Sequence, residues 1–310
     1  MPGTAAGRTG SGRKRWGWAA LMAGAFLAGL LLVGVILIRA PGTERSTGDN
    51  LADSPVAVPM SPVASDNGAA GPAPGPRLAI LVDDFGYDPV RDAEWLDFPE
   101  RITVSVLPYG PSSKSFAASA RTHGFGVILH VPMEAEGGVA DRTESFLLRR
   151  EMTPEEIGDR FARMAADVPE ANGASNHMGS AFTSDLAAMA SFAQALKGKG
   201  FFFVDSVTSA GTVAIMAMED AGVPAMRRDV FLDDRRLEEM RRQCAAVIAL
   251  AKERGEAVLQ CHARSETRRA LLELLLQMRA EGIRPVAVEE LLVGQDTLSY
   301  PPRLEPRVSR

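Results

Sequence analysis

The sequence predicts an α/β fold, namely a single distorted or incomplete (β/α) barrel. From Arg77 onward, short apolar runs alternate with amphipathic helical patterns of ten or more residues. Such alternation is typical of right-handed βαβ units that build a parallel sheet. Seven or eight units within about 220 residues suit one barrel better than two open sheets. A composition of 46% hydrophobic and 24% charged residues provides for a core.

The first 39 residues predict a transmembrane anchor. Arg13–Arg15 precede an uncharged run from Trp16 to Ile38, and 23 apolar and small residues are enough to span a bilayer. The run ends at Arg39 without a small-residue cleavage site, which favours an uncleaved helix over a signal peptide. Basic residues before the span orient the rest of the chain outward. We therefore expect a single-pass protein of the bacterial inner membrane, with its folded part in the periplasm or otherwise outside the cytoplasm.

The anchor is followed by three regions of different composition. Residues 40–76 are rich in Pro, Ala, Gly and Ser, which is typical of a flexible linker. Residues 77–294 carry the α/β pattern of the folded domain, and residues 295–310 form a proline-containing tail that we expect to be loose.

The expected elements follow in chain order. The strands are Leu78–Asp83, Ile102–Leu107, Gly126–Val131, Ala174–His177, Phe201–Asp205, Ala225–Leu232, Ala257–Cys261 and Pro285–Val288. The helices are Ser112–Thr122, Pro154–Asp167, Asp185–Leu196, Thr212–Ala221, Arg235–Arg254 and Glu266–Ala280. Each strand is a short apolar run, and each helix has apolar residues at helical spacing.

The charge of the chain excludes some partners. Residues 41–310 carry 29 Lys and Arg against 39 Asp and Glu, a net charge of −10. Such a body would repel a phosphate backbone, so we expect no nucleic-acid partner. Two cysteines, Cys244 and Cys261, are too few for a disulfide scaffold. A bridge between them is disfavoured, because one is predicted on a helix and the other on a strand.

Polar side chains gather where the expected strands end. In parallel barrels the active site lies at the carboxyl ends of the strands. These ends carry Asp83-Asp84, Pro108-Tyr109, His130, Asn176-His177, Asp205-Ser206, Arg228-Asp229 with Asp233, and His262. Three of the four histidines in the chain lie there. The fourth, His123, precedes Gly124 at a helix end and has a structural role.

The adjacent carboxylates of Asp83 and Asp84 suggest a metal site. Like charges resist joint ionisation, and a cation relieves that cost. In the alternative, one carboxylate caps a turn and the other is solvated. His130 and His177, taken singly, would be ordinary buried histidines. Together with a carboxylate they match the two-histidine, one-carboxylate set that holds a catalytic zinc while leaving a position open for water.

Six segments resemble motifs of the divergent polysaccharide deacetylases, a distant branch of the polysaccharide deacetylase group with a distorted (β/α) barrel. They are Ile80–Gly86, Val106–Tyr109, Leu129–Glu134, Asn176–Ser180, Phe203–Thr208 and Arg228–Asp233. The chain departs from the family at Cys261-His262-Ala263, where Gly-His-Pro is usual. It also carries Glu134 where typical polysaccharide deacetylases place their second metal histidine, so that His177 must supply it.

The resemblance implies a role for each of the residues at the strand ends. Asp84, His130 and His177 would bind a divalent metal, with zinc favoured. Asp83 would act as general base toward a metal-activated water that attacks an N-acetyl group, and His262 as general acid toward the departing amine.

Six further residues are candidates for contact with substrate or with the metal ligands: Tyr109, Glu134, Asn176, Asp205, Arg228 and Asp229. Asp205 would orient a histidine, bind sugar hydroxyls or cap the turn at residues 206–212. Glu134 is either a partner of a metal-ligating histidine or a loop carboxylate. For Arg228 and Asp229 a structural ion pair is favoured.

The sequence thus favours a membrane-anchored envelope deacetylase acting on an N-acetylated glycan. It identifies no protein partner. A non-catalytic, metal-containing glycan- or partner-binding protein is the alternative, and the altered flanks of His262 favour it. A third hypothesis is a glycosidase that uses Asp205 with Asp229 or Asp233 and needs no metal.

Overall fold

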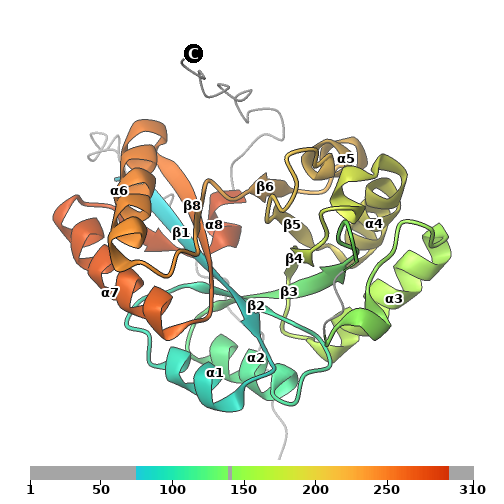
Figure 1. Cartoon of the computed structure of the whole chain (residues 1–310), viewed down its shortest axis with the longest axis horizontal. Helices are drawn as coiled ribbons and strands as arrows, with labels where there is room; N and C mark the ends of the chain where they lie inside the picture. The colour runs from blue at the N-terminus through green and yellow to red at the C-terminus, as the bar shows by residue number, and fades with distance from the viewer. Residues whose placement is uncertain (1–74, 139–141, 293–310) are drawn as a thin grey trace, which may run out of the picture. The chain divides into compact units, whose positions relative to one another are not determined.

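The computed structural model describes residues 75–138 and 142–292, which form one parallel sheet wrapped by helices (Figure 1). The strands are β1 (Arg77–Phe85), β2 (Thr103–Val106), β3 (Gly126–Met133), β4 (Gly173–Met178), β5 (Phe202–Asp205), β6 (Ala225–Arg227), β7 (Val230–Leu232), β8 (Glu256–His262) and β9 (Arg284–Val286). Their order is β6-β5-β4-β3-β2-β1-β8-β7, and β9 pairs with the beginning of β1. All pairings are parallel, as the sequence predicts.

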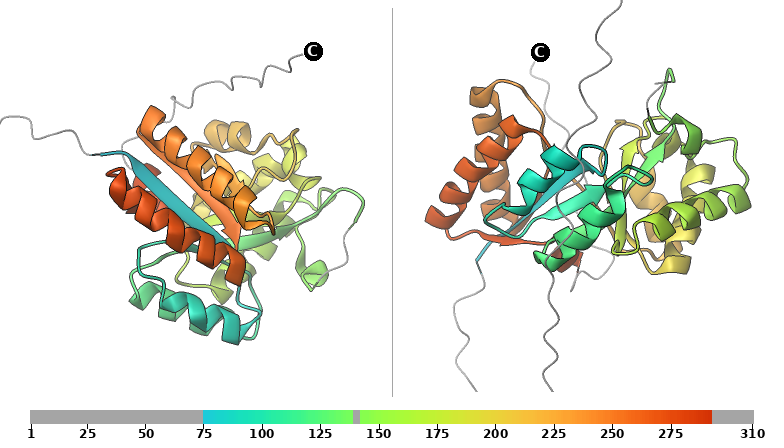
Figure 2. Two further views of the ribbon diagram at one scale, coloured as in Figure 1. Left: turned by 60° about the vertical axis from the view of Figure 1, so that its left-hand side comes forward. Right: turned by 90° about the horizontal axis from the view of Figure 1, so that it is seen from below.

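The helices lie on the outside of the curved sheet, except for the short α8, which packs on the inner cluster (Figure 2). They are α1 (Pro89–Leu96), α2 (Ser113–Thr122), α3 (Pro154–Asp167), α4 (Leu186–Lys199), α5 (Ala214–Ala221), α6 (Leu237–Arg254), α7 (Ser265–Ala280) and α8 (Val288–Leu292). Local signals set their ends: Thr153 and Glu156 form a capping box before α3, and Gly200 ends α4 in the left-handed conformation. The six predicted helices are confirmed, whereas α1 and α8 were not predicted.

The alternation of side chains along the strands divides the core into two clusters. On β1, Leu78, Ile80 and Val82 pack outward against the helices, whereas Ala79 and Leu81 belong to a smaller inner cluster. The inner cluster also takes residues from α8. Because successive residues alternate faces, the position after Leu81 on the inner face is Asp83. The same alternation brings polar residues of several strands to the inner face.

The predicted single strand Ala225–Leu232 is wrong, because this segment forms two strands at opposite edges of the sheet. β6 pairs with β5, and β7 pairs with β8. Between them, the Arg228 amide donates to the Asp205 carbonyl, and the Asp229 amide donates to the Val258 carbonyl. The chain changes partner here because the curved sheet brings its two edges together. Residues 228–229 therefore link the two edge strands of a half-barrel.

The predicted anchor, linker and tail fall on residues 1–74 and 293–310, outside the described residues. Within the part that is described, no helix has the length and apolar character needed to cross a membrane.

Both cysteines are free and buried, Cys244 on α6 and Cys261 on β8. Burial raises the pKa of the Cys244 thiol to about 12 and that of Cys261 well above its usual range. We expect neither thiol to react with an aromatic disulfide reagent in the native chain at about pH 8, because the thiolate is the reactive form. Denaturation without reductant should expose two thiols per chain, and a lower count would reveal a disulfide and contradict this assignment.

Candidate metal centre

The centre begins where β1 ends, at Asp83 and Asp84. The pairing of β1 with β2 slips by one residue between Val82 and Phe85, and Asp84 adopts a left-handed backbone with φ of 70°. Neighbouring residues of a regular strand point to opposite faces, so this bulge is what lets both carboxylates reach the same site. The position of the Asp84 carboxylate thus depends on a strained backbone conformation, which neighbouring residues must stabilise.

Two residues of α1 hold this strained turn. The Arg91 guanidinium donates to the Asp84 carbonyl oxygen at 2.5 Å and also pairs with Asp92. Asp92 is almost fully buried, and its other oxygen accepts from the Gly86 amide and the Ser112 hydroxyl. The sequence analysis missed both residues, because α1 itself was not predicted.

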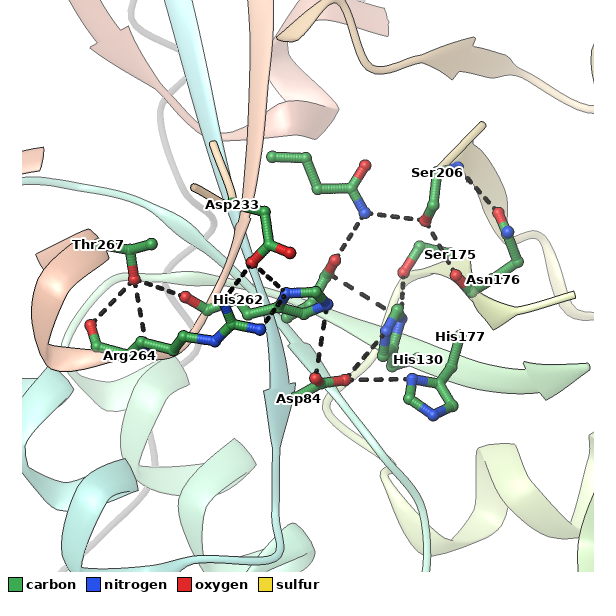
Figure 3. A network of polar contacts seen from close by, with 12 residues as sticks. Asp84, His130, Ser175, Asn176, His177, Ser206, Asp233, His262, Arg264 and Thr267 are labelled. Atoms are coloured by element: carbon green, nitrogen blue, oxygen red, sulfur yellow. Dashed lines mark hydrogen bonds and ion pairs between the residues drawn. The ribbon is translucent and has the colours of Figure 1, made fainter. Parts of the chain in front are cut away.

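The predicted metal ligands meet at one point (Figure 3). One ligand atom each of Asp84, His130 on β3 and His177 on β4 lies within 4.8 Å of the others. Asp84 Oδ1 is 3.4 Å from His130 Nε2 and 3.1 Å from His177 Nδ1. Two ligands on one tetrahedral zinc lie about 3.3 Å apart, given bonds of roughly 2.0–2.1 Å. The three residues therefore have the spacing of a metal-binding set.

The electrostatics of these residues also fit a divalent cation. Burial alone would raise the pKa of the Asp84 carboxyl, but the contacts and charges of His130 and His177 outweigh it and hold the pKa well below its usual range. Burial lowers the pKa of His130 to about 4, so its ring is neutral at pH 7. Asp84 Oδ1 is buried with no hydrogen-bond partner among the described residues. An ionised carboxylate beside a neutral imidazole is the form in which metal ligands bind.

Asp83 lies beneath this cluster and is 2% exposed. Its Oδ2 atom accepts from Gln260 Nε2 at 2.7 Å, and the same nitrogen donates to Ser206 Oγ at 2.8 Å. Burial and the neighbouring charge of Asp84 raise the pKa of Asp83 well above its usual range. Asp83 is therefore a stronger base than an ordinary carboxylate. The sequence analysis missed Gln260, although it shares the inner face of β8 with His262.

His262 lies on the opposite side of Asp84 from the other two histidines (Figure 3). Its Nε2 atom is 3.7 Å from Asp84 Oδ2, and its Nδ1 atom is 2.7 Å from Asp233 Oδ1. Arg264 also pairs with Asp233, at 2.6 Å. Asp233 thereby holds the ring with Nε2 directed toward the metal cluster, which leaves this nitrogen available for proton transfer.

Of the further candidates, three carboxylates have structural partners. Glu134 pairs with Arg150, which makes it a loop carboxylate. Asp205 accepts from the Val207 amide and the Thr212 hydroxyl, as expected for the cap of the following turn. Asp229 pairs with Arg254 and accepts from the Val258 amide. With these partners, Asp205 and Asp229 do not form the free carboxylate pair that a glycosidase requires.

The remaining candidates lie around the centre. Arg228 donates to the carbonyls of Ser206 and Val207, so its contacts differ from the predicted ion pair with Asp229. Its guanidinium also lies over the Phe231 ring, whose edge faces His262.

Of the last two candidates, Asn176 lies within β4 and Tyr109 follows β2. Asn176 connects β4 to the turn after β5: its amide donates to the Met178 carbonyl, and its side-chain oxygen accepts from the Ser206 amide. Tyr109 is 43% exposed, has a left-handed backbone and packs edge-on against Phe146.

Comparison with known families decides what this architecture is. The model of the divergent polysaccharide deacetylases matches residues 80–292. The chain belongs to this family. It is 36% identical over 229 residues to the uncharacterized protein YibQ of Escherichia coli K12, covering 73% of this chain and 71% of YibQ. An uncharacterized protein of Haemophilus influenzae is 32% identical, with 72% and 76% covered. The resemblance seen in the six sequence motifs is thus confirmed.

A solved structure shares the fold of this deacetylase-family chain. The crystal structure of the uncharacterized protein ATU2773 from Agrobacterium tumefaciens superposes with a TM-score of 0.68 at 23% identity. The match covers 71% of this chain and 91% of the other. At this level of identity the likeness concerns the fold alone.

The metal centre can be tested by removing one ligand at a time. We expect His130→Ala and His177→Ala each to weaken zinc binding by at least about tenfold, since a three-ligand site loses one protein donor. His123→Ala is the matched control, because His123 caps α2 and contacts only Ser119 and Phe125 among the interactions described. Competition with a chromogenic chelator measures the affinity. Parent-like binding by both ligand variants would place the metal elsewhere.

Proposed function

We propose that the protein is a membrane-anchored, metal-dependent deacetylase of the bacterial envelope that removes acetyl groups from an N-acetylated glycan. One observation carries the proposal: the Asp84, His130 and His177 cluster adjoins both a buried carboxylate, Asp83, and an oriented imidazole, His262. Hydrolysis of an amide needs a base, an acid and an electrophile at one point. Membership of the family supports a polysaccharide as substrate.

The residues of the chain divide the proton transfers between them. A divalent metal, with zinc favoured by the donor set, would supply the Lewis acid for the acetyl carbonyl and activate the water. Asp83 accepts the proton of the attacking water, and its raised pKa suits this role. His262 delivers a proton from Nε2 to the departing amine, while Asp233 holds Nδ1. The bond that breaks is the amide C–N bond, and the products are acetate and a free amine.

A second function has one observation in its favour. The flanks of His262 are Cys261 and Ala263, and both side chains are buried. The proposed acid therefore lies in a differently built loop from the Gly-His-Pro that is usual in the family. A protein that binds a glycan without hydrolysing it would keep the metal cluster and tolerate such a change.

Acetate release separates the two functions. The full-length chain, loaded with zinc, should release acetate from at least one of chito-oligomers, peptidoglycan fragments or acetylated exopolysaccharide, and a chelator should abolish this release. Asp83→Asn and His262→Ala should retain metal but lose about 10²–10⁴-fold in rate, the usual contribution of a general acid or base. His123→Ala should keep the parent rate.

Other outcomes would contradict the deacetylase. Zinc-loaded protein that binds these glycans without releasing acetate would establish the binding function instead. Glycan-chain cleavage that a chelator does not affect would point to a glycosidase.

The location of the protein is part of the proposal and rests on the sequence of residues 1–39. Basic residues before the apolar run support an outward-facing domain attached to the inner membrane. Protease added to intact spheroplasts that express the full chain should then digest the domain, while a cytoplasmic marker protein stays intact. Complete protection of the domain in the same preparation would exclude this orientation.

A further inference from the structure

Two serines form a hydrogen-bonded chain that runs from the metal cluster into the interior of the sheet. Ser175 on β4 lies directly beside His130 of β3 in the strand register. Its Oγ atom is 2.8 Å from His130 Nδ1 and 2.7 Å from the Oγ atom of Ser105 on β2. Both serines are fully buried. A hydroxyl without a partner is costly in such a place, so these contacts belong to the folded state.

The hydroxyl pair ends at Ser105 and does not bond the proposed base. Asp83 Oδ2 accepts from Gln260, and Asp83 Oδ1 has no hydrogen-bond partner among the described residues. Asp83 Oδ1 and His130 Nδ1 are 4.0 Å apart, which is too far for a direct hydrogen bond. The Nδ1 atom of His130 is therefore held by Ser175, and Ser175 in turn by Ser105.

Once His130 binds a metal, the number of available protons fixes which group donates in each hydrogen bond between His130 and the two serines. Nε2 is the ring nitrogen that faces Asp84, at 3.4 Å from Oδ1, so it must offer its lone pair to the cation. Nδ1 then carries the ring proton and donates to Ser175. Each hydroxyl has a single proton, so Ser175 donates its own proton to Ser105.

We propose that Ser175 and Ser105 are positioning residues of the metal centre. Ser175 holds the His130 ring with Nε2 toward the metal, and Ser105 holds the Ser175 hydroxyl in the orientation that this requires. The inference rests on the proposed metal-dependent function. It adds to that function two residues that touch neither metal nor substrate. Neither was a candidate in the sequence, since a lone serine in a strand carries no signal.

Metal affinity tests the role of Ser175 without relying on activity. In the full-length chain, Ser175→Ala should weaken zinc binding by about 10–100-fold, the usual effect of removing the outer partner of a ligating histidine. Ser175→Thr keeps the hydroxyl and should restore most of the affinity. Ser105→Ala leaves the contact with His130 in place and should weaken binding less than Ser175→Ala does.

The matched control is Ser113→Ala. Ser113 is equally buried, but its hydroxyl donates to the Leu107 carbonyl and accepts from the Gly110 amide. Its replacement should leave zinc affinity unchanged. A loss of affinity in the control equal to that in Ser175→Ala would show a general effect of cavities in the domain and overturn the proposal.

NMR spectroscopy reports directly which nitrogen of the His130 ring carries the proton. With only four histidines in the chain, ¹⁵N-histidine labelling should resolve His130 in the zinc-loaded protein. We expect a protonated Nδ1 that exchanges slowly with water, and a loss of that protection in Ser175→Ala. A natively folded Ser175→Ala protein with parent-like zinc affinity and an unchanged His130 signal would overturn the proposal.

The outcomes distinguish this proposal from the proposed activity. A parent that binds zinc and releases no acetate contradicts the deacetylase, while the affinity series still decides the role of the serines. A parent that releases acetate together with a Ser175→Ala variant of equal zinc affinity contradicts the serine chain alone. A parent that binds no zinc contradicts both.

Discussion

The structure depends on two adjacent carboxylates at the end of one strand, Asp83 buried and Asp84 half-buried. The two repel each other, and a folded chain tolerates both only when each is compensated separately. Gln260 donates to Asp83, whereas the imidazoles of His130 and His177 lie beside Asp84. A bulge and a left-handed backbone turn the second carboxylate into place, and Arg91 donates to the backbone of that turn from α1. Without the two carboxylates, these surrounding groups would have no charge to compensate.

The alternation of side chains across the sheet explains which residues the sequence revealed and which it concealed. Three histidines lie at or near strand ends: His130, His177 and His262. They could be found in the sequence because each follows or ends an apolar run. Gln260, Ser105 and Ser175 share the same inner face but lie within or before those ends. Their significance depends on the register between neighbouring strands, which a single sequence does not contain. The fold class and the metal-binding set could thus be predicted, but the residues that support them could not.

Where the sequence analysis failed, non-local constraints were decisive. Ala225–Leu232 looks like one strand, because the alternation continues through it, but the two halves pair with strands from opposite edges. The sequence left two roles open for Asp205, a site residue or the cap of a turn. Its two carboxylate oxygens accept from the Val207 amide and the Thr212 hydroxyl, as expected for the cap. Helix α8 is five residues long, too short for a periodic pattern to stand out, whereas α1 was missed although α5, of the same eight residues, was predicted.

The dipeptide Arg228-Asp229 links the two edges of the half-barrel. On one side of β1, β8 and the residues after β7 carry His262 and Asp233; on the other, β3 and β4 carry the two histidines of the cluster. These two groups of strands are joined at β1 and are linked a second time by the amides of Arg228 and Asp229, which donate to Asp205 of β5 and Val258 of β8. The separation between the acid and the metal ligands is therefore a property of sheet curvature. Substitutions that alter packing around this dipeptide would change the alignment of the two groups of strands while leaving each group intact.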